Sequence, residues 1–258
     1  MDKGKPSPSA LSIEEANRNK LQFSGHGSAK GSAGYIDLYD DLEAFEHLAK
    51  RGDMIALSPP SAGFQNFTVG CAWDNAHIPD TSFFGKILKR VKHANVDLDL
   101  GCLFELQDGH KGALQAFGEL HGALNAPPYI ALSDDDRTGN TQGDDEILTF
   151  SGTNWEKIKR VLLYVYIYNG AEDFYDVKPQ IQVRVPNHKP MVVTLGARHE
   201  DMDICAIASL ENVRNGIKLT NHTEYFNGHA EMDRAFGYGI EWEDGQKQGA
   251  PPPHKSRI

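Results

Sequence analysis

The chain has 258 residues, of which 40% are hydrophobic and 24% are charged, a composition typical of one globular domain or two small ones. Its formal net charge of −10 argues against nucleic acid as the main partner, because phosphate contacts need a clustered basic surface. The three cysteines show no C-x-x-C spacing and no signal-peptide core precedes them, which predicts a reduced, cytoplasmic protein. No apolar run approaches the roughly 18 residues of a membrane span, so no integral membrane contact is expected.

Both ends of the chain have compositions typical of flexible segments. Residues 1–34 are polar and end in SGHGSAKGSAG, a Gly/Ser/Ala-rich linker. Residues 248–258 form a Pro-rich, basic tail. The sequence therefore predicts a disordered arm over 1–34, a folded domain over 35–247 and a disordered tail.

Between these ends, most of the pattern has the period of two that is typical of strands. In VDLDLGCLF (96–104), apolar residues alternate with Asp97, Asp99 and Gly101. RVLLYVYIY (160–168) is apolar on both faces, which predicts a strand buried on both sides. Further strands are predicted over 53–58, 66–73, 129–133, 146–150, 181–185, 191–195 and 204–213. Short strands at this spacing predict an all-β fold, a β-sandwich of two sheets with a few short helices.

Two segments have helical patterns. Residues 81–94, TSFFGKILKRVKHA, place apolar side chains on one stripe and basic ones elsewhere. Such a helix either packs on the sandwich with a solvated basic face or docks onto a partner or membrane. Residues 228–237 predict a second short helix. His229 and Glu231 match half of a zinc-deaminase motif, but the Cys half is absent, so a surface helix is favoured.

An acidic stretch, LSDDDRTGNTQGDDEILTF (132–150), separates two predicted strands. It places six acidic residues and one Arg within the thirteen positions from 134 to 146. A solvated turn, a catalytic carboxylate pair and a cation cage are the three interpretations of such a cluster. The catalytic one needs a pocket with a poised acid and base, and nothing in the pattern distinguishes one of these carboxylates from its neighbours.

Part of this stretch has the ligand spacing of a calcium loop. Asp134, Asp136, Thr138 and Gly139 match the opening of an EF-hand loop, and Asp145 falls at the position of its last ligand. The flanking sequence predicts strands where an EF-hand has helices. The stretch therefore offers the carboxylate, hydroxyl and backbone carbonyl oxygens that Ca²⁺ prefers, in a β context.

The strand VDLDL (96–100) adds two carboxylates to this argument. Asp97 and Asp99 share one face, roughly 7 Å apart at the strand rise. Two like charges about 4 Å apart cost roughly 4 kcal/mol at an effective dielectric near 20, so a cluster of these acids favours a bound cation. Zinc is disfavoured because no Cys or His accompanies the carboxylates.

Several longer motifs resemble a known family. The segments VGCAWD (69–74), VDLDLGCLFEL (96–106), DDRTGNTQGDDE (135–146) and IKRVLLYVYIYNGA (158–171) resemble the tellurium-resistance TerD family. Its TerA-type members are matched by GCLFELQDGHKGALQAFG (101–118), PPYIALSDDDRTG (127–139), CAIASLENV (205–213) and GHAEMDRAFGYGIEW (228–242). The resemblance covers roughly residues 50–247.

The resemblance implies a calcium-binding β-sandwich that takes part in resistance to tellurite and other stress, with protein partners in that system and no established enzymatic activity. The implied calcium ligands are Asp97, Asp99, Asp135, Asp136, Asp144, Asp145 and Glu146. The chain departs from the family at Asp134, where Gly is usual, and in an insertion over residues 75–95.

Other functions stay open at this point. The same carboxylates would suit a metal-dependent hydrolase or a nucleotide-acting enzyme that uses Mg²⁺. A Ca²⁺-dependent membrane adaptor would dock through the helix predicted over 82–93. Tyr164, Tyr166 and Tyr168 are interpreted as packing residues rather than a stacking platform for bases. Cys102 is interpreted as a small hydrophobe rather than a tellurite-reducing thiol.

Overall fold

The computed structural model describes residues 43–73, 77–79, 91–93, 96–116, 120–133, 146–169, 173–177, 179–195, 202–243 and 246–247. All of these residues belong to the unit Ser32–Ile258. The arm predicted over 1–34 and the tail predicted over 248–258 lie outside the described residues, so the domain boundaries stay a prediction. No helix in the described part of the chain is long and apolar enough to cross a membrane.

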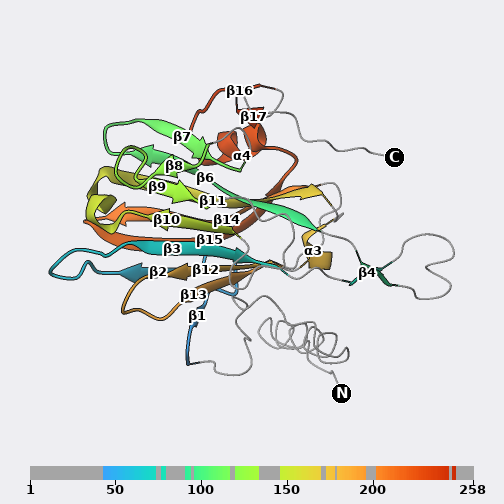
Figure 1. The fold of residues 1–258 in the computed structure, drawn as a ribbon, viewed down its shortest axis with the longest axis horizontal. Helices are drawn as coiled ribbons and strands as arrows, with labels where there is room; N and C mark the ends of the chain where they lie inside the picture. The colour runs from blue at the N-terminus through green and yellow to red at the C-terminus, as the bar shows by residue number, and fades with distance from the viewer. Residues whose placement is uncertain are drawn as a thin grey trace, which may run out of the picture. The chain divides into compact units, whose positions relative to one another are not determined.

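The described strands form two large sheets that make a β-sandwich, and the predicted all-β fold is confirmed (Figure 1). One sheet has seven strands in the order β1-β13-β12-β3-β10-β9-β8, and the other has six in the order β2-β15-β14-β11-β6-β7. The strands of the first are β1 (Glu46–His47), β3 (Phe67–Ala72), β8 (Gly122–Ala123), β9 (Ile130–Leu132), β10 (Glu146–Phe150), β12 (Gln180–Arg184) and β13 (Met191–Thr194). Those of the second are β2 (Met54–Leu57), β6 (Asp97–Leu106), β7 (Lys111–Leu114), β11 (Ile158–Asn169), β14 (Ile204–Val213) and β15 (Gly216–Phe226).

Smaller elements complete the described chain. Two short ribbons pair β4 (His77–Pro79) with β5 (Val91–His93), and β16 (Trp242–Glu243) with β17 (Gln246–Lys247). The helices are the 3-10 helix η2 (Gly152–Lys157), α3 (Phe174–Val177) and α4 (His229–Phe236).

The helix predicted over 81–94 is wrong at its end. Val91–His93 is a strand that pairs antiparallel with His77–Pro79, and residues 80–90 lie outside the described part of the chain. The amphipathic pattern reflects a local preference for helix. At these three residues, pairing with His77–Pro79 overrides that preference. The helix predicted over 228–237 is confirmed as α4.

The predicted strands are present with bounds shifted by two residues at most. The long strand β15 was missed, as were the shorter strands β1, β7 and β8 and the strands of the two short ribbons. The sequence of β15, GIKLTNHTEYF, mixes polar residues into both faces and lacks a clear alternation. β15 is held by pairing with β14 on one side and β2 on the other. A strand whose partners supply its stability need not have a strong local pattern.

The main core lies between the two sheets. Alternate residues of β11 and β6, such as Val165 and Leu100, meet Val69 and Leu148 of the seven-stranded sheet in one apolar cluster. Phe67 stacks on Phe150 with ring centroids 4.8 Å apart, and both rings lie edge-on to Trp155. This core holds the two sheets in a fixed relation at the positions where the candidate site is built.

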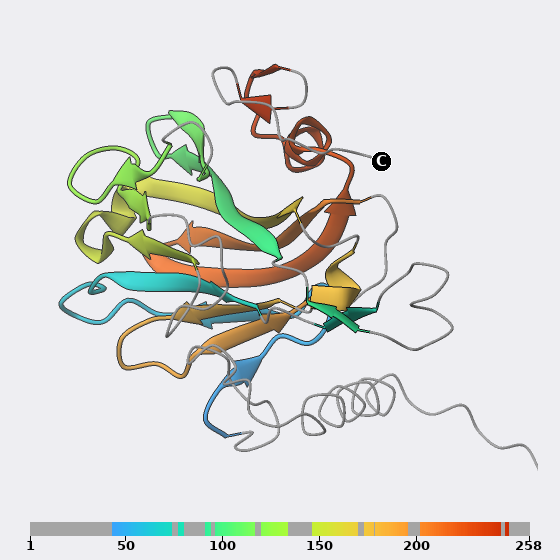
Figure 2. The same cartoon turned by 45° about the vertical axis from the view of Figure 1, so that its right-hand side comes forward.

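A second apolar cluster covers the outer face of the six-stranded sheet. Leu162, Tyr164 and Tyr166 of β11 pack there with Met232 of α4 and with Tyr238. Figures 1 and 2 show α4 beside this sheet. The prediction that β11 is buried on both faces is therefore confirmed, and the tyrosines pack as expected.

Candidate functional site

The two aspartates of the VDLDL strand lie at the start of β6 on the outer face of the six-stranded sheet. Leu98 and Leu100 point into the core between the sheets, so the alternation places Asp97 and Asp99 on the opposite face. Asp99 is buried, with 5% of its surface exposed, and Asp97 is half-buried. Across the strand pair, Asp99 stands opposite Tyr166 and Asp97 opposite Asn169.

Glu146 connects this end of β6 to the other sheet. It begins β10, and it shares the inward face of that strand with Leu148 and Phe150. Its side chain is almost fully buried, and Glu146 Oε2 accepts a hydrogen bond from the backbone amide of Leu100. The carboxylate of Glu146 therefore lies at the backbone of Leu100, the residue that follows Asp99 on β6.

The bonds around Ser133 define where the acidic stretch begins and ends. Ser133 N donates to Ile147 O over 2.8 Å, and Ile147 N donates to Ser133 Oγ over 3.0 Å. Ser133 and Ile147 are thus held together, and Glu146 is the first described residue after residues 134–145. Because Glu146 reaches Leu100, the base of the acidic stretch lies beside the strand that carries Asp97 and Asp99.

The remaining predicted ligands lie outside the described residues. These are Asp135, Asp136, Thr138, Gly139, Asp144 and Asp145. Among the residues that the structure describes, no group of three or more His, Cys, Asp or Glu side chains is arranged to hold a metal ion. The described part of the candidate site, here called its wall, is therefore Asp97 and Asp99 on the outer face of β6 with Glu146 at the backbone of Leu100. A complete site needs oxygens from residues 134–145.

The donor chemistry of this wall fits a hard cation. Asp97 Oδ1, Asp99 Oδ2 and Glu146 Oε1 are oxygens with almost no access to solvent. A buried carboxylate requires compensating charge or hydrogen-bond donors, and oxygen ligands are those that Ca²⁺ and Mg²⁺ prefer. Asp97, Asp99 and Glu146 provide neither thiolate nor imidazole for a softer metal.

The acidic residues at this end of β6 help to raise the pKa of two tyrosines of β11. Burial raises the pKa of Tyr164 well above its usual value, and electrostatic interaction with Cys102, Asp99 and Glu146 raises it further. The pKa of Tyr166 is also raised, first by burial and then by Asp203 and Asp99. No local sequence signal connects Asp203 to Asp99, because Asp203 directly precedes β14, which reaches this part of the sheet by pairing with β11.

The cysteines do not form a reactive site. Cys71, Cys102 and Cys205 are buried and are not in disulfides. Burial raises the pKa of Cys102 to about 12, so its sulfur is a protonated thiol at neutral pH. The thiolate is the nucleophilic form, and Cys102 therefore behaves as the small hydrophobe that its position on β6 predicts.

A surface groove of about 420 Å³ lies away from the carboxylates. It lies where β3 begins and β12 ends, and its polar lining residues are Asn66, Thr68, Arg184, Asn187 and His188. Glu146 pairs with Cys71 at the opposite end of β3. The groove contains none of the predicted site residues, so it gives no support to an enzyme that would use them.

Comparison with known proteins gives one informative result. No protein-family profile matches the chain. The chain is 38% identical over 152 residues to the Tellurium resistance protein TerA of an Alcaligenes species. The aligned region covers 59% of this chain and 44% of TerA, so the chain spans less than half the length of this relative. The match agrees with the motifs in the sequence, and it supports a TerA-type member of the tellurium-resistance family.

Proposed function

We propose that this chain is a calcium-binding, non-enzymatic protein that contributes to resistance against tellurite and other chemical stress. Its similarity to a tellurium-resistance protein supports the stress-resistance role. Because the chain spans 44% of that relative, the activity and partners of the whole relative are part of this proposal. A cytoplasmic location stays a prediction from the cysteine content.

The observation that carries the proposal is the position of Glu146. This residue ends the acidic stretch, and its carboxylate is bonded to the backbone of β6 next to Asp99. Two sequence motifs, the Asp-x-Asp strand and the Asp-rich stretch, therefore meet at one place in the fold. The proposed calcium ligands are Asp97, Asp99, Asp135, Asp136, Thr138, Gly139, Asp144, Asp145 and Glu146.

Calcium at this position has a physical consequence for partners. Six to eight oxygens around one ion would connect residues 134–145 to the start of β6 and cancel their mutual repulsion. Ion binding of this kind couples to local folding, which orders a surface for protein partners. The proposed mode of action is therefore calcium-dependent assembly rather than catalysis.

Calorimetric titration of metal-stripped protein with Ca²⁺ tests the site. Asp99→Asn keeps the shape of the side chain and removes its charge, and it should raise the dissociation constant at least tenfold, about 1.4 kcal/mol of binding free energy. Asp108→Asn is the matched control. Asp108 is exposed, and its Oδ1 accepts a hydrogen bond of 2.9 Å from His110 N. That variant should bind like the wild type.

Two outcomes would reject the proposal. One is the absence of any binding heat in the wild type, and the other is equal affinity in Asp99→Asn and Asp108→Asn. Preference for Mg²⁺ over Ca²⁺, with several waters kept on the ion, would instead favour the enzyme alternative.

A further inference from the structure

The outer face of the six-stranded sheet carries acidic residues at both ends of β6. The side chains of Asp97, Asp99, Gly101, Leu103 and Glu105 alternate along this face. From Asp99 to Glu105 the strand runs roughly 20 Å at the usual rise per residue. The Asp99 end belongs to the proposed calcium site, and the Glu105 end does not.

The middle of this face is covered by residues 228–243, here called the C-terminal clasp. Within it, Met232 and Tyr238 are buried against Leu103 and Leu162, and Phe236, Ile240 and Trp242 pack at the edge of the same cluster. Asp233 ties the clasp together. It accepts hydrogen bonds from Gly239 N at 2.8 Å, Ile240 N at 2.7 Å and Trp242 Nε1 at 2.8 Å. The clasp is therefore an internally bonded unit.

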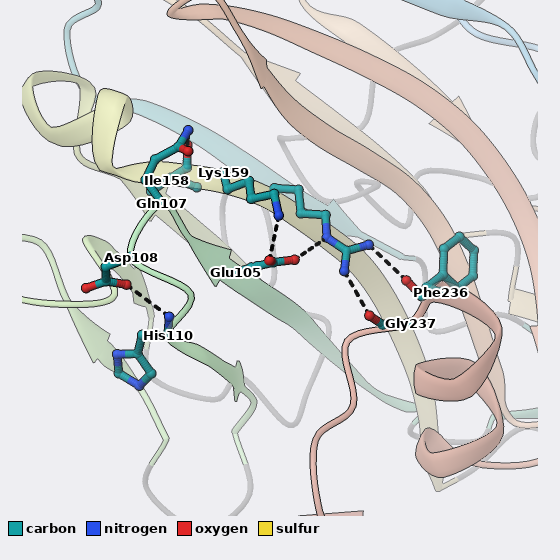
Figure 3. A network of polar contacts seen from close by, with 9 residues as sticks. Glu105, Gln107, Asp108, His110, Ile158, Lys159, Phe236 and Gly237 are labelled. Carbon is teal, nitrogen blue, oxygen red and sulfur yellow. Dashed lines mark hydrogen bonds and ion pairs between the residues drawn. The ribbon is translucent and has the colours of Figure 1, made fainter.

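One anchor of the clasp lies at the Glu105 end (Figure 3). Arg160 stands opposite Glu105 on β11, and its Nε donates to Glu105 Oε2 over 2.6 Å. Its two terminal nitrogens donate to Phe236 O and Gly237 O, each over 2.9 Å, at the C-terminal end of α4. The guanidinium also lies 4.1 Å from the ring centroid of Tyr238. This anchor satisfies backbone carbonyls that the end of a helix leaves open.

The other anchor is aromatic and lies toward the Asp99 end. The ring of His229 contacts Tyr164 and Tyr166 at centroid distances of 5.2 and 5.4 Å, and it stacks on Trp242 at 5.2 Å. Tyr166 is the residue that stands opposite Asp99. The first residue of α4 is thus one side chain away from a proposed calcium ligand.

Tyr164 is tightly packed between the clasp and β6. Its ring lies so close to Gly101 that a Cβ on Gly101 would be 2.3 Å from Tyr164 Cζ. The hydroxyl of Tyr164 donates to Gln115 Oε1 over 3.2 Å. A densely packed cluster transmits displacement. If the clasp shifts at His229, Tyr164 or Tyr166 must therefore shift, or the β6 backbone between Asp99 and Gly101 must move.

We propose that the C-terminal clasp positions Asp99 for the cation, so that calcium binding and closure of the clasp strengthen each other. This inference rests on the proposed function. Coupling between two sites is reciprocal: if the closed clasp raises calcium affinity by some factor, calcium stabilises the closed clasp by the same factor. His229 and Trp242 act as positioning residues through Tyr164 and Tyr166, without contacting the ion.

Two measurements on the full chain test this linkage. In hydrogen exchange of the wild type, saturating Ca²⁺ should slow the amides of residues 229–236 by roughly fivefold or more, the lower end of usual coupling between sites. In Ca²⁺ titration, Trp242→Ala should weaken binding by a similar factor, since it removes the ring that stacks on His229.

The matched control is Met191→Ala, which opens the core between the sheets on β13 without touching the clasp. It should keep the wild-type calcium affinity. Equal affinity in wild type and Trp242→Ala, with exchange of residues 229–236 unchanged by Ca²⁺, would overturn the linkage and leave the calcium site standing. A wild type that binds no Ca²⁺ would overturn both proposals. If Trp242→Ala does not fold, the exchange measurement on the wild type decides alone.

Discussion

The buried side chain of His229 makes the free energy of unfolding depend on pH. The sequence suggested a surface helix here, but only 7% of His229 is exposed, because its ring fills the space between Tyr164, Tyr166 and Trp242. Burial lowers the pKa of His229 from 6.5 to about 4. Between these values the unfolded chain binds a proton at this position and the folded chain does not.

The free energy of unfolding should therefore fall as the pH is lowered from 7 to 5. Well above pH 6.5 the imidazole is neutral in both the folded and the unfolded state, and it then contributes nothing to the pH dependence. The loss assigned to His229 is roughly 2 kcal/mol over this interval. Burial also lowers the pKa of His47 and His222, which adds loss in the same direction.

Urea denaturation of variants at both pH values isolates the share of His229. The variant His229→Phe should lose about 2 kcal/mol less stability between pH 7 and pH 5 than the wild type does. The variant His188→Phe replaces an exposed histidine on the β12–β13 turn and should keep the wild-type dependence. An identical pH dependence in wild type and His229→Phe would show that the ring is protonated in the folded state.

At the scale of the element, β6 and β11 combine two functions on one strand pair. Their inward residues form part of the core between the sheets, and their outward residues form the surface against which the clasp packs. The register places Arg160 opposite Glu105 and Tyr166 opposite Asp99. The same two strands therefore carry both the ionic anchor and the wall of the proposed calcium site.

The ionic anchor should make a measurable contribution to stability. Arg160→Gln removes the bond to Glu105, whose side chain is 8% exposed, and both bonds to the end of α4. Lys159 stays bonded to Glu105 over 2.7 Å, so the carboxylate keeps one cationic partner. The expected loss is about 2 kcal/mol in the free energy of unfolding, measured by urea denaturation.

Arg51→Gln is the matched control for that variant. Arg51 pairs with Glu224, but the two side chains are 64% and 33% exposed. An exposed pair of this kind contributes less than about 1 kcal/mol because solvent screens it. If both variants lose the same stability, the bonds from Arg160 to Phe236 and Gly237 contribute nothing beyond a surface ion pair.

At the scale of the whole molecule, calcium should stabilise the folded chain by mass action. An ion that binds only the folded state, at a thousandfold excess over its dissociation constant, adds about 4 kcal/mol. For a domain of this size that corresponds to a rise of roughly 10 °C in Tm. Thermal melts of metal-stripped protein in Ca²⁺, in Mg²⁺ at the same ionic strength and in chelator measure it. Identical melts in Ca²⁺ and chelator would contradict a calcium site.

Much of the fold was predictable because local pattern records which side chains are buried. The alternation in VDLDLGCLF placed Leu98 and Leu100 in the core and Asp97 and Asp99 on the other face, as the structure has them. β11 was predicted to be buried on both sides for the same reason. β15 was not predicted because polar residues interrupt its pattern, and it is held between its hairpin partner β14 and the distant strand β2. The strand at Val91–His93 was not predicted because its local pattern favoured a helix, and pairing with His77–Pro79 overrode that preference.

The sequence by itself determined the strand spacing, the acidic character of the candidate site and the similarity to TerA. Only the tertiary structure decided that Glu146 reaches across to the backbone of β6, and that His229 is covered by Trp242 and two tyrosines. A sequence pattern specifies how much of each residue is buried. Which distant element covers that residue depends on sheet order and register, and these are set by packing over the whole domain.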